Sequence, residues 1–258
     1  MKKTAIIAAL DRELHPLVDG WTRTCLEANG KSLPCYERED AVAVAGGIGC
    51  ERSEQAARAV VAKYQPKVLI SAGLAGALIR SLKVASIVTP NVIVDAVSGA
   101  EYRCQLGGDV VGGGVLVSSQ GIAGAEAKTG LVERCHALVV DMEAAGVARV
   151  AEETRTGFRC VKAISDELDF NLPPLQRFVD KEGAFQNGRF AAWAALRPWC
   201  WASVIQLARN SARATKALSA WLEKNLAGNL VSATVVTLKG AEYFNSIARK
   251  PGTGGMPV

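Results

Sequence analysis

The sequence lacks the cysteine and histidine patterns of metalloproteins and of disulfide-bonded secreted proteins. Its seven cysteines are scattered, odd in number and never spaced as CxxC, so neither a disulfide framework nor a structural zinc site is expected. His15 and His136 are far apart in the sequence and have no obvious third ligand. No apolar run reaches the ~18–20 residues that a membrane-spanning helix needs. We therefore expect a cytoplasmic protein with reduced thiols, no metal and no other cofactor.

A secretory leader and a nucleic-acid footprint are also missing. The apolar run 4–10 after Lys2 and Lys3 is short and meets Asp11 without a small-residue cleavage site, which favours a first strand over a signal peptide. Thirty basic residues against 25 acidic ones give a net charge of +5, and the basic residues form only short clusters. This excess is too small to predict nucleic-acid binding.

The common nucleotide-binding loops are absent as well. After the glycines at 46–49, the position that would complete a dinucleotide-binding fingerprint is Arg52, and no Walker A lysine motif occurs. The glycines at 46–49 and 73–76 instead follow two predicted strands, at the edge of a sheet where ligand crevices form. There they either form tight turns or let backbone amides approach an anion.

What the sequence does contain is an alternation of strands and helices. Apolar, β-branched segments predict strands, and i, i+3, i+4, i+7 stripes predict helices at 57–64 and 144–151. The predicted strands cover residues 5–10, 41–45, 68–72, 87–94, 114–118, 138–140 and 160–164. The fold class is therefore α/β, with three layers and a mixed, mostly parallel sheet flanked by helices.

The chain is expected to form one domain, 1–258, whose C-terminal part differs from its core. The core covers 4–168, and a helical tail follows at 175–226, with Trp201, Val204, Ile205 and Ala208 on one predicted stripe. Pro198 is expected to separate two helices, because proline is tolerated in a first turn. The glycine-containing end, 250–258, is expected to be disordered.

Three acidic residues stand at the ends of predicted strands. Glu13 follows the first strand, Glu143 opens a predicted helix, and Asp166 closes the strand after that helix. Each alone is explained by a helix cap or a solvated surface charge. Together on one rim of a sheet, they suggest acid–base chemistry in one cleft.

The order of five segments resembles the nucleoside phosphorylase/nucleosidase superfamily, and within it the methylthioadenosine/S-adenosylhomocysteine nucleosidase-like branch. The matching segments lie at 5–13, 46–49, 66–76, 140–145 and 161–166, and the last two read Val-Asp-Met-Glu-Ala-Ala and Val-Lys-Ala-Ile-Ser-Asp. Five segments in the correct order are far more specific than any one of them. The resemblance spans about residues 4–168 and does not include the helical tail.

The resemblance implies cleavage of the N-glycosidic bond of a purine nucleoside. Asp166 would protonate N7 of the departing base, which requires a carboxylic acid that holds its proton in a dry pocket. Glu143 would hold the ribose 2′-hydroxyl, Met142 would lie beneath the sugar, and Glu13 would orient or deprotonate the attacking water. The other positions expected to contact substrate are Ser165, Gly73 and Ile122.

The sequence departs from the family pattern around the nucleophile. Leu74 stands where nucleosidases carry serine, Lys162 stands where they carry arginine, and Ile122 replaces an aromatic residue that stacks on the base. Lys162 and the amides of Gly47, Ile48 and Gly49 could still accept an anion. Both water and phosphate therefore stay open as the nucleophile, with water favoured.

A hopanoid-associated branch of the superfamily, which releases adenine from adenosylhopane, looks similar in the Asp-Met-Glu and Lys-Ala-Ile-Ser-Asp segments. The tryptophans and arginines of the tail would suit such a lipid-linked nucleoside, although a packed helix pair or a dimer interface explains them better than contact with a membrane surface. Relatives commonly form dimers, so a homodimer is expected. The alternatives are a non-catalytic nucleoside-binding or sensor protein on the same fold and a purely structural assembly protein.

Overall fold

The computed structural model describes residues 3–105, 113–121, 128, 130–131, 134–170, 172–180 and 183–227. The predicted disordered end, 250–258, lies outside these residues. The elements are β1 (Thr4–Ala8), α1 (Asp11–Leu14), β2 (Thr22–Ala28), β3 (Lys31–Glu37), β4 (Ala41–Ala45), α2 (Cys50–Tyr64), β5 (Val68–Ala77), β6 (Ile87–Val88), β7 (Val92–Asp95), β8 (Glu101–Arg103), β9 (Val115–Ser118), β10 (Ala137–Asp141), α4 (Ala144–Glu153), β11 (Gly157–Asp166), the 3₁₀ turn η1 (Leu175–Phe178), α5 (Asn187–Ala195), the 3₁₀ turn η2 (Pro198–Cys200) and α6 (Trp201–Ala227).

The strands form one mixed sheet, which confirms the predicted fold class. Its order is β2-β3-β4-β1-β5-β10-β9-β7-β8, and β11 lies along β5 and also pairs with β6. The pairs that surround the centre, β4 with β1, β1 with β5 and β5 with β11, are parallel. The pairs of β2 with β3 and of β7 with β8 at the two ends of this order are antiparallel. The carboxyl ends of β1, β5 and β11 consequently meet at one edge.

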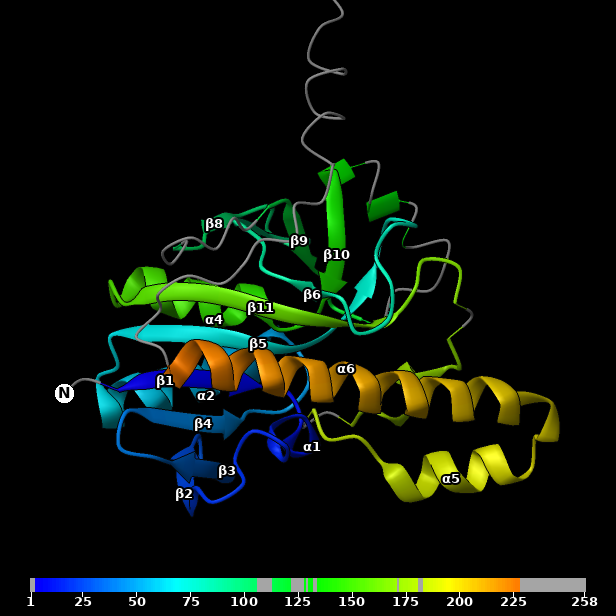
Figure 1. Cartoon of the computed structure of the whole chain (residues 1–258), viewed down its shortest axis with the longest axis horizontal. Helices are drawn as coiled ribbons and strands as arrows, with labels where there is room; N and C mark the ends of the chain where they lie inside the picture. The colour runs from blue at the N-terminus through cyan, green and yellow to red at the C-terminus, as the bar shows by residue number, and fades with distance from the viewer. Residues whose placement is uncertain are drawn as a thin grey trace, which may run out of the picture.

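Helices cover both faces of the sheet, and Figure 1 shows α6 running along the front of the sheet near β1 and β5, with α2 and α4 behind the strands. Alternate residues of β1 face the two layers: Ala5 and Ile7 belong to the core beneath α2 and α4, and Ile6 and Ala8 belong to the core beneath α6. The α2 and α4 layers pack so closely that a Cβ at Gly146 would overlap the carbonyl oxygen of Cys50.

Several predicted strand boundaries were wrong. β5 does not end at residue 72 but continues through the glycines to Ala77, because these residues pair with β11. The predicted strand 87–94 is two strands, β6 and β7. The hairpin of β2 and β3 was missed, although its Asn29-Gly30 turn, with φ of 48° and 73°, is a strong hairpin signal.

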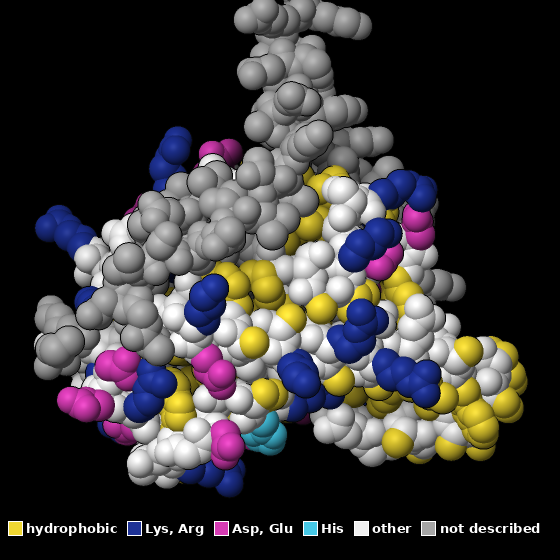
Figure 2. Space-filling model, in the orientation of Figure 1, with side chains coloured by type: hydrophobic (Ala, Val, Ile, Leu, Met, Phe, Trp, Pro, Cys, Tyr) yellow, Lys and Arg dark blue, Asp and Glu magenta, His cyan; other side chains and the backbone are white. Residues whose placement is uncertain are grey.

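The tail forms a helical hairpin whose α5 end extends past the sheet (Figure 1). Pro198 starts the 3₁₀ turn between α5 and α6, as predicted. The predicted stripe of α6 was wrong at three of its four positions, because Trp201 is 50% exposed, Ile205 is 48% exposed and Ala208 is exposed as well. Figure 2 shows hydrophobic side chains gathered at the free end of this hairpin. In the described part of the chain, no helix is both long and apolar enough to cross a bilayer.

Candidate active site

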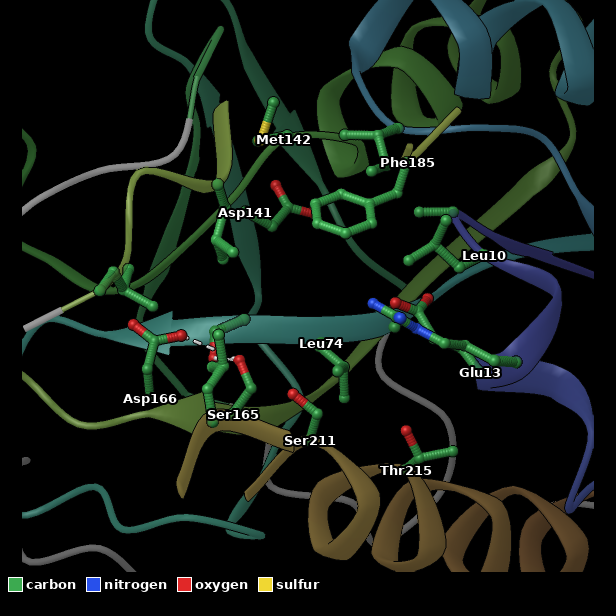
Figure 3. A pocket seen from close by; sticks show the side chains of 18 of the residues that line it. Leu10, Glu13, Leu74, Asp141, Met142, Ser165, Asp166, Phe185, Ser211 and Thr215 are labelled. Carbon is green, nitrogen blue, oxygen red and sulfur yellow. Dashed lines mark hydrogen bonds between the residues drawn. The ribbon is translucent and has the colours of Figure 1, made fainter. Parts of the chain in front are cut away.

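A cavity of about 630 Å³ opens at the carboxyl edge of the sheet, between the strands and α6. The residues after β1, the second half of β5 and the ends of β10 and β11 form its floor, and the tail forms its opposite wall. Figure 3 shows Glu13 and Asp166 on opposite sides of this cavity, with Leu74 between them. Glu143 also lines it, so the structure brings all three predicted acids to one place.

Glu13 lies in the single turn of α1 and is buried. Its Oε2 atom has no hydrogen-bond partner among the described residues. Burial raises the pKa of Glu13, and the positive charges of Lys162 and Arg12 only partly oppose this. A Cβ at Gly73 would lie 3.2 Å from Oε2, so glycine leaves space beside this carboxyl group. Glu13 therefore has the properties of a general base, which accepts a proton during the reaction.

Glu143 immediately precedes α4, and two backbone amides hold its carboxyl group. Gly49 donates to Oε1 at 3.0 Å, and Met142 donates to Oε2 at 3.3 Å. Burial and the negative charge of Asp141 raise the pKa of Glu143 to about 7, against the opposing charge of Lys162. At neutral pH this side chain can change protonation state.

Lys162 lies beneath the cavity floor and forms an ion pair of 2.7 Å with Asp141. Asp141 also accepts hydrogen bonds from Ser118 Oγ at 2.6 Å and from the Ala144 amide at 2.9 Å. Burial alone would lower the pKa of Lys162, but Asp141 and neighbouring groups raise it above its ordinary value. Lys162 does not line the cavity. Its positive charge acts on Asp141, Glu13 and Glu143 from outside the cavity lining. This corrects the expectation that Lys162 binds an anion in the cavity.

The amides of Gly47, Ile48 and Gly49 are also engaged, contrary to the expectation of an anion-binding loop. Gly47 donates to the Ala9 carbonyl at 2.9 Å, and Ile48 donates to the Gly183 carbonyl at 2.8 Å. The Gly49 amide donates to Glu143. The loop therefore fixes the first strand, the tail and Glu143 in place, and Ile48 is the member of the three that lines the cavity.

Asp166 at the end of β11 is half of a buried ion pair that the sequence did not predict. Lys128 Nζ lies 2.6 Å from Asp166 Oδ2, and Ser165 Oγ donates to Oδ1 at 2.9 Å. Asp166 lies where the predicted acid is expected, and its carboxyl group has a cationic neighbour in Lys128. Lys128 comes from a stretch for which neither a strand nor a helix was predicted, so it was not identified from the sequence.

Of the other predicted positions, Met142, Gly73, Leu74 and Ser165 line the cavity, and Ile122 lies outside the described residues. The tail adds a largely apolar wall that the sequence did not assign to the site. Its members are Leu172, Leu175, Val179, Phe185, Asn187, Phe190, Val204, Leu207, Ala208, Ser211, Ala212 and Thr215. On α6 they recur at i, i+3, i+4, i+7, which is one helical face.

Comparisons with known proteins agree with this architecture. Residues 3–112 match the model of the phosphorylase superfamily. No curated protein matches the chain. The 5′-methylthioadenosine/S-adenosylhomocysteine nucleosidase of Helicobacter pylori, crystallised with butyl-thio-DADMe-Immucillin-A, is 16% identical with a TM-score of 0.65, covering 89% of this chain and 99% of its own.

Two further solved structures have the same fold. The futalosine hydrolase of Helicobacter pylori is 16% identical with a TM-score of 0.65, over 89% of this chain and 98% of its own. The 5′-methylthioadenosine nucleosidase of Arabidopsis thaliana is 15% identical with a TM-score of 0.69, over 92% of this chain and 99% of its own. These likenesses cover a larger share of the chain than residues 4–168, over which the sequence resemblance extends.

Proposed function

We propose that the chain is a member of the phosphorylase superfamily, whose model matches residues 3–112, and that it is an enzyme that cleaves the N-glycosidic bond of a purine nucleoside and releases the base. One observation carries the proposal. Glu13, Glu143 and Asp166 come from three separate elements and line a single cavity, with Glu13 and Asp166 on opposite sides of it. Cleavage of a glycosidic bond needs an acid and a base on opposite sides of the reacting carbon.

Each acid has one part in the reaction. The purine lies toward Asp166, where it receives a proton as the bond between C1′ and N9 breaks. Glu143 accepts a hydrogen bond from the ribose 2′-hydroxyl, and its negative charge stabilises the positive charge that develops on the sugar. Glu13 takes a proton from the water that attacks C1′.

Water is the nucleophile that this arrangement supports best. A phosphate ion needs free donors, and the amides of Gly47, Ile48 and Gly49 are engaged with protein acceptors. Lys162 is paired with Asp141. The unpartnered Oε2 of buried Glu13 is an acceptor, which suits the hydrogen of a water molecule.

The group attached to the ribose 5′ carbon is proposed to be large and apolar, as in adenosylhopane, which would place the reaction in hopanoid biosynthesis. The support is the wall that the tail builds opposite the acids, which includes Phe185, Phe190 and Leu207. Burial of apolar surface there contributes about 25 cal/mol per Å² to binding.

We further propose that the enzyme is a cytoplasmic homodimer. No residue of α5 is fully buried within one chain, and Leu196 and Trp199 at the end of the hairpin are exposed. A second copy packed against this face would cover the exposed apolar side chains.

The direct test measures adenine release by chromatography, with and without phosphate, from adenosine, methylthioadenosine, S-adenosylhomocysteine and a series of 5′-alkylthioadenosines. We expect release without phosphate, with kcat/KM rising as the alkyl chain lengthens. Tight binding of these nucleosides without release of base from any of them would contradict the enzyme and favour a nucleoside-binding or sensor protein.

A further inference from the structure

Lys128 is a buried cation beside the candidate acid Asp166. Its side chain is 1% exposed, and its Nζ atom contacts Asp166 Oδ2 at 2.6 Å and the Glu167 carbonyl oxygen at 3.2 Å. It also lines the cavity beside Asp166. Burying such a pair costs several kcal/mol per ion in desolvation, so the arrangement is a weak source of stability.

The surrounding structure leaves little freedom to this pair. Asp166 Oδ1 accepts from Ser165 Oγ while Oδ2 accepts from Lys128, so both carboxyl oxygens act as acceptors. Gly76 in β5 lies against both partners. A Cβ at this position would stand 2.8 Å from Asp166 Oδ2 and 3.3 Å from Lys128 Nζ. A carboxylate in such an ion pair must take up a proton before it can act as an acid.

The other cations near the acids cannot supply that proton. Among the described residues that line the cavity, the two cations are Arg12 and Lys128. Arg12 lies over the ring of Phe185, and an arginine does not release its proton in a protein. Lys162 lies outside the lining and is held by Asp141. A lysine ammonium group, in contrast, can become a neutral amine.

We propose that the proton that reaches the departing purine originates on the ammonium group of Lys128 and passes through Asp166, an inference that rests on the proposed function. As the bond between C1′ and N9 breaks, its electron pair stays on the purine. The proton leaves Lys128 Nζ for Asp166 Oδ2 and continues to N7 of the base. Lys128 becomes a neutral amine, Asp166 ends as the carboxylate it was, and the base leaves neutral. A proton from solvent restores Lys128 in the next cycle.

The test compares two substrates in the full-length protein. Adenosine needs a proton on its leaving group, whereas 4-nitrophenyl riboside releases a stable anion and needs none. We expect K128M to lower kcat for adenosine about 10²–10⁴-fold, the usual value of general acid catalysis, and to leave the rate with the aryl riboside unchanged. K83M is the matched control, because Lys83 is exposed and pairs with the neighbouring Glu167.

Two more variants separate proton transfer from charge and from folding. K128R keeps the positive charge but cannot give up a proton, so we expect its kcat for adenosine to stay as low as that of K128M. G76A keeps both charges and forces them apart, and we expect the same selective loss with adenosine. Recovery of kcat in K128R, or an equal loss with both substrates, would overturn the inference. A wild-type protein that cleaves neither substrate would instead contradict the proposed function.

Discussion

At the scale of single residues, Glu13 is the side chain whose substitution best separates binding from chemistry. Glutamine has the same shape but cannot take a proton, so E13Q should lower kcat about 10²–10⁴-fold with little change in KM. Because it removes a buried carboxyl group with an unpartnered oxygen, it should not lower thermal stability. The matched control is E51Q on the exposed face of α2. Full activity of E13Q in steady-state kinetics would remove Glu13 from the mechanism.

The raised pKa of Glu143 predicts that the affinity for the ribose part of the substrate depends on pH. Its ionised carboxylate accepts a hydrogen bond from the 2′-hydroxyl more strongly than the protonated acid does, and its pKa is raised to about 7. The affinity for an uncleaved riboside should therefore rise as the pH increases through about 7, whereas the affinity for free adenine should not change over that range. In E143Q the riboside dependence should disappear. Titration calorimetry measures both, and a pH-independent wild-type affinity would contradict this role.

The same pKa predicts an effect on stability with a definite sign. A carboxyl group that binds its proton more tightly in the folded state than in the unfolded state stabilises the fold at low pH. That contribution is complete below the ordinary value of 4.5 and is lost as the pH rises through about 7. E143Q should therefore be more stable than wild type at pH 8 by roughly 1–3 kcal/mol, and not at pH 4. Denaturant titrations at the two pH values would check this.

Part of the residue-level site could be predicted from sequence because acids at the ends of parallel strands meet at one edge of a sheet, as Glu13 after β1 and Asp166 in β11 do. Glu143 follows β10, which pairs antiparallel with β5, so its position rested on the family resemblance instead. Lys128 was not predicted, because no strand or helix was expected in the segment that contains it. The engaged amides of the loop 46–49 could not be predicted either, because their acceptors Ala9 and Gly183 are distant in the sequence.

At the scale of elements, α6 has two faces with different tasks. Leu207 lines the cavity, and Ile205 is 48% exposed. L207A should weaken the preference for long 5′-alkyl substituents by about 1–3 kcal/mol, the contribution of one buried aliphatic side chain, and leave adenosine unaffected. I205A is the matched control and should change neither. An equal loss with adenosine and long-chain substrates in L207A would contradict an apolar subsite on this helix.

The elements themselves were predicted unevenly for physical reasons. Helices α2 and α4 have clear apolar stripes, whereas the predicted stripe of α6 mixed a cavity-facing side with an exposed one. Periodicity identifies an apolar helix face but not what that face packs against. Val204, which lines the cavity, and Trp201, which is exposed, were therefore assigned to the same stripe. β5 was cut short because glycine normally weakens a strand, and its pairing with β11 was not visible in the sequence.

At the scale of the whole molecule, the close contact between helices α2 and α4 limits which residues the fold tolerates at their interface. G146A introduces a methyl group that would overlap the Cys50 carbonyl and approach Ser53 Oγ, so it should destabilise the protein by about 1–3 kcal/mol. G188A in α5 is the control, because no atom of the described residues lies within 4 Å of its added Cβ. Equal unfolding midpoints for the two variants in urea would contradict this packing.

The overall architecture followed from the sequence because alternating strands and helices leave few arrangements that bury both faces of a sheet. The position of the tail did not follow. It depends on contacts such as those of Ala214 and Leu218 with the sheet, which join residues far apart in the chain. The tail forms the wall of the cavity, so the part of the site that chooses the substrate was the part that sequence reasoning could not place.

The central claim is that three carboxyl groups around one cavity hydrolyse a purine nucleoside. Its most direct test is to incubate the protein with adenosine in ¹⁸O-labelled water, free of phosphate, and to determine the mass of the sugar product. We predict adenine release with one ¹⁸O atom in each ribose, strongly reduced in E13Q. Bound adenosine recovered intact, or release that requires phosphate and leaves ribose unlabelled, would contradict the account.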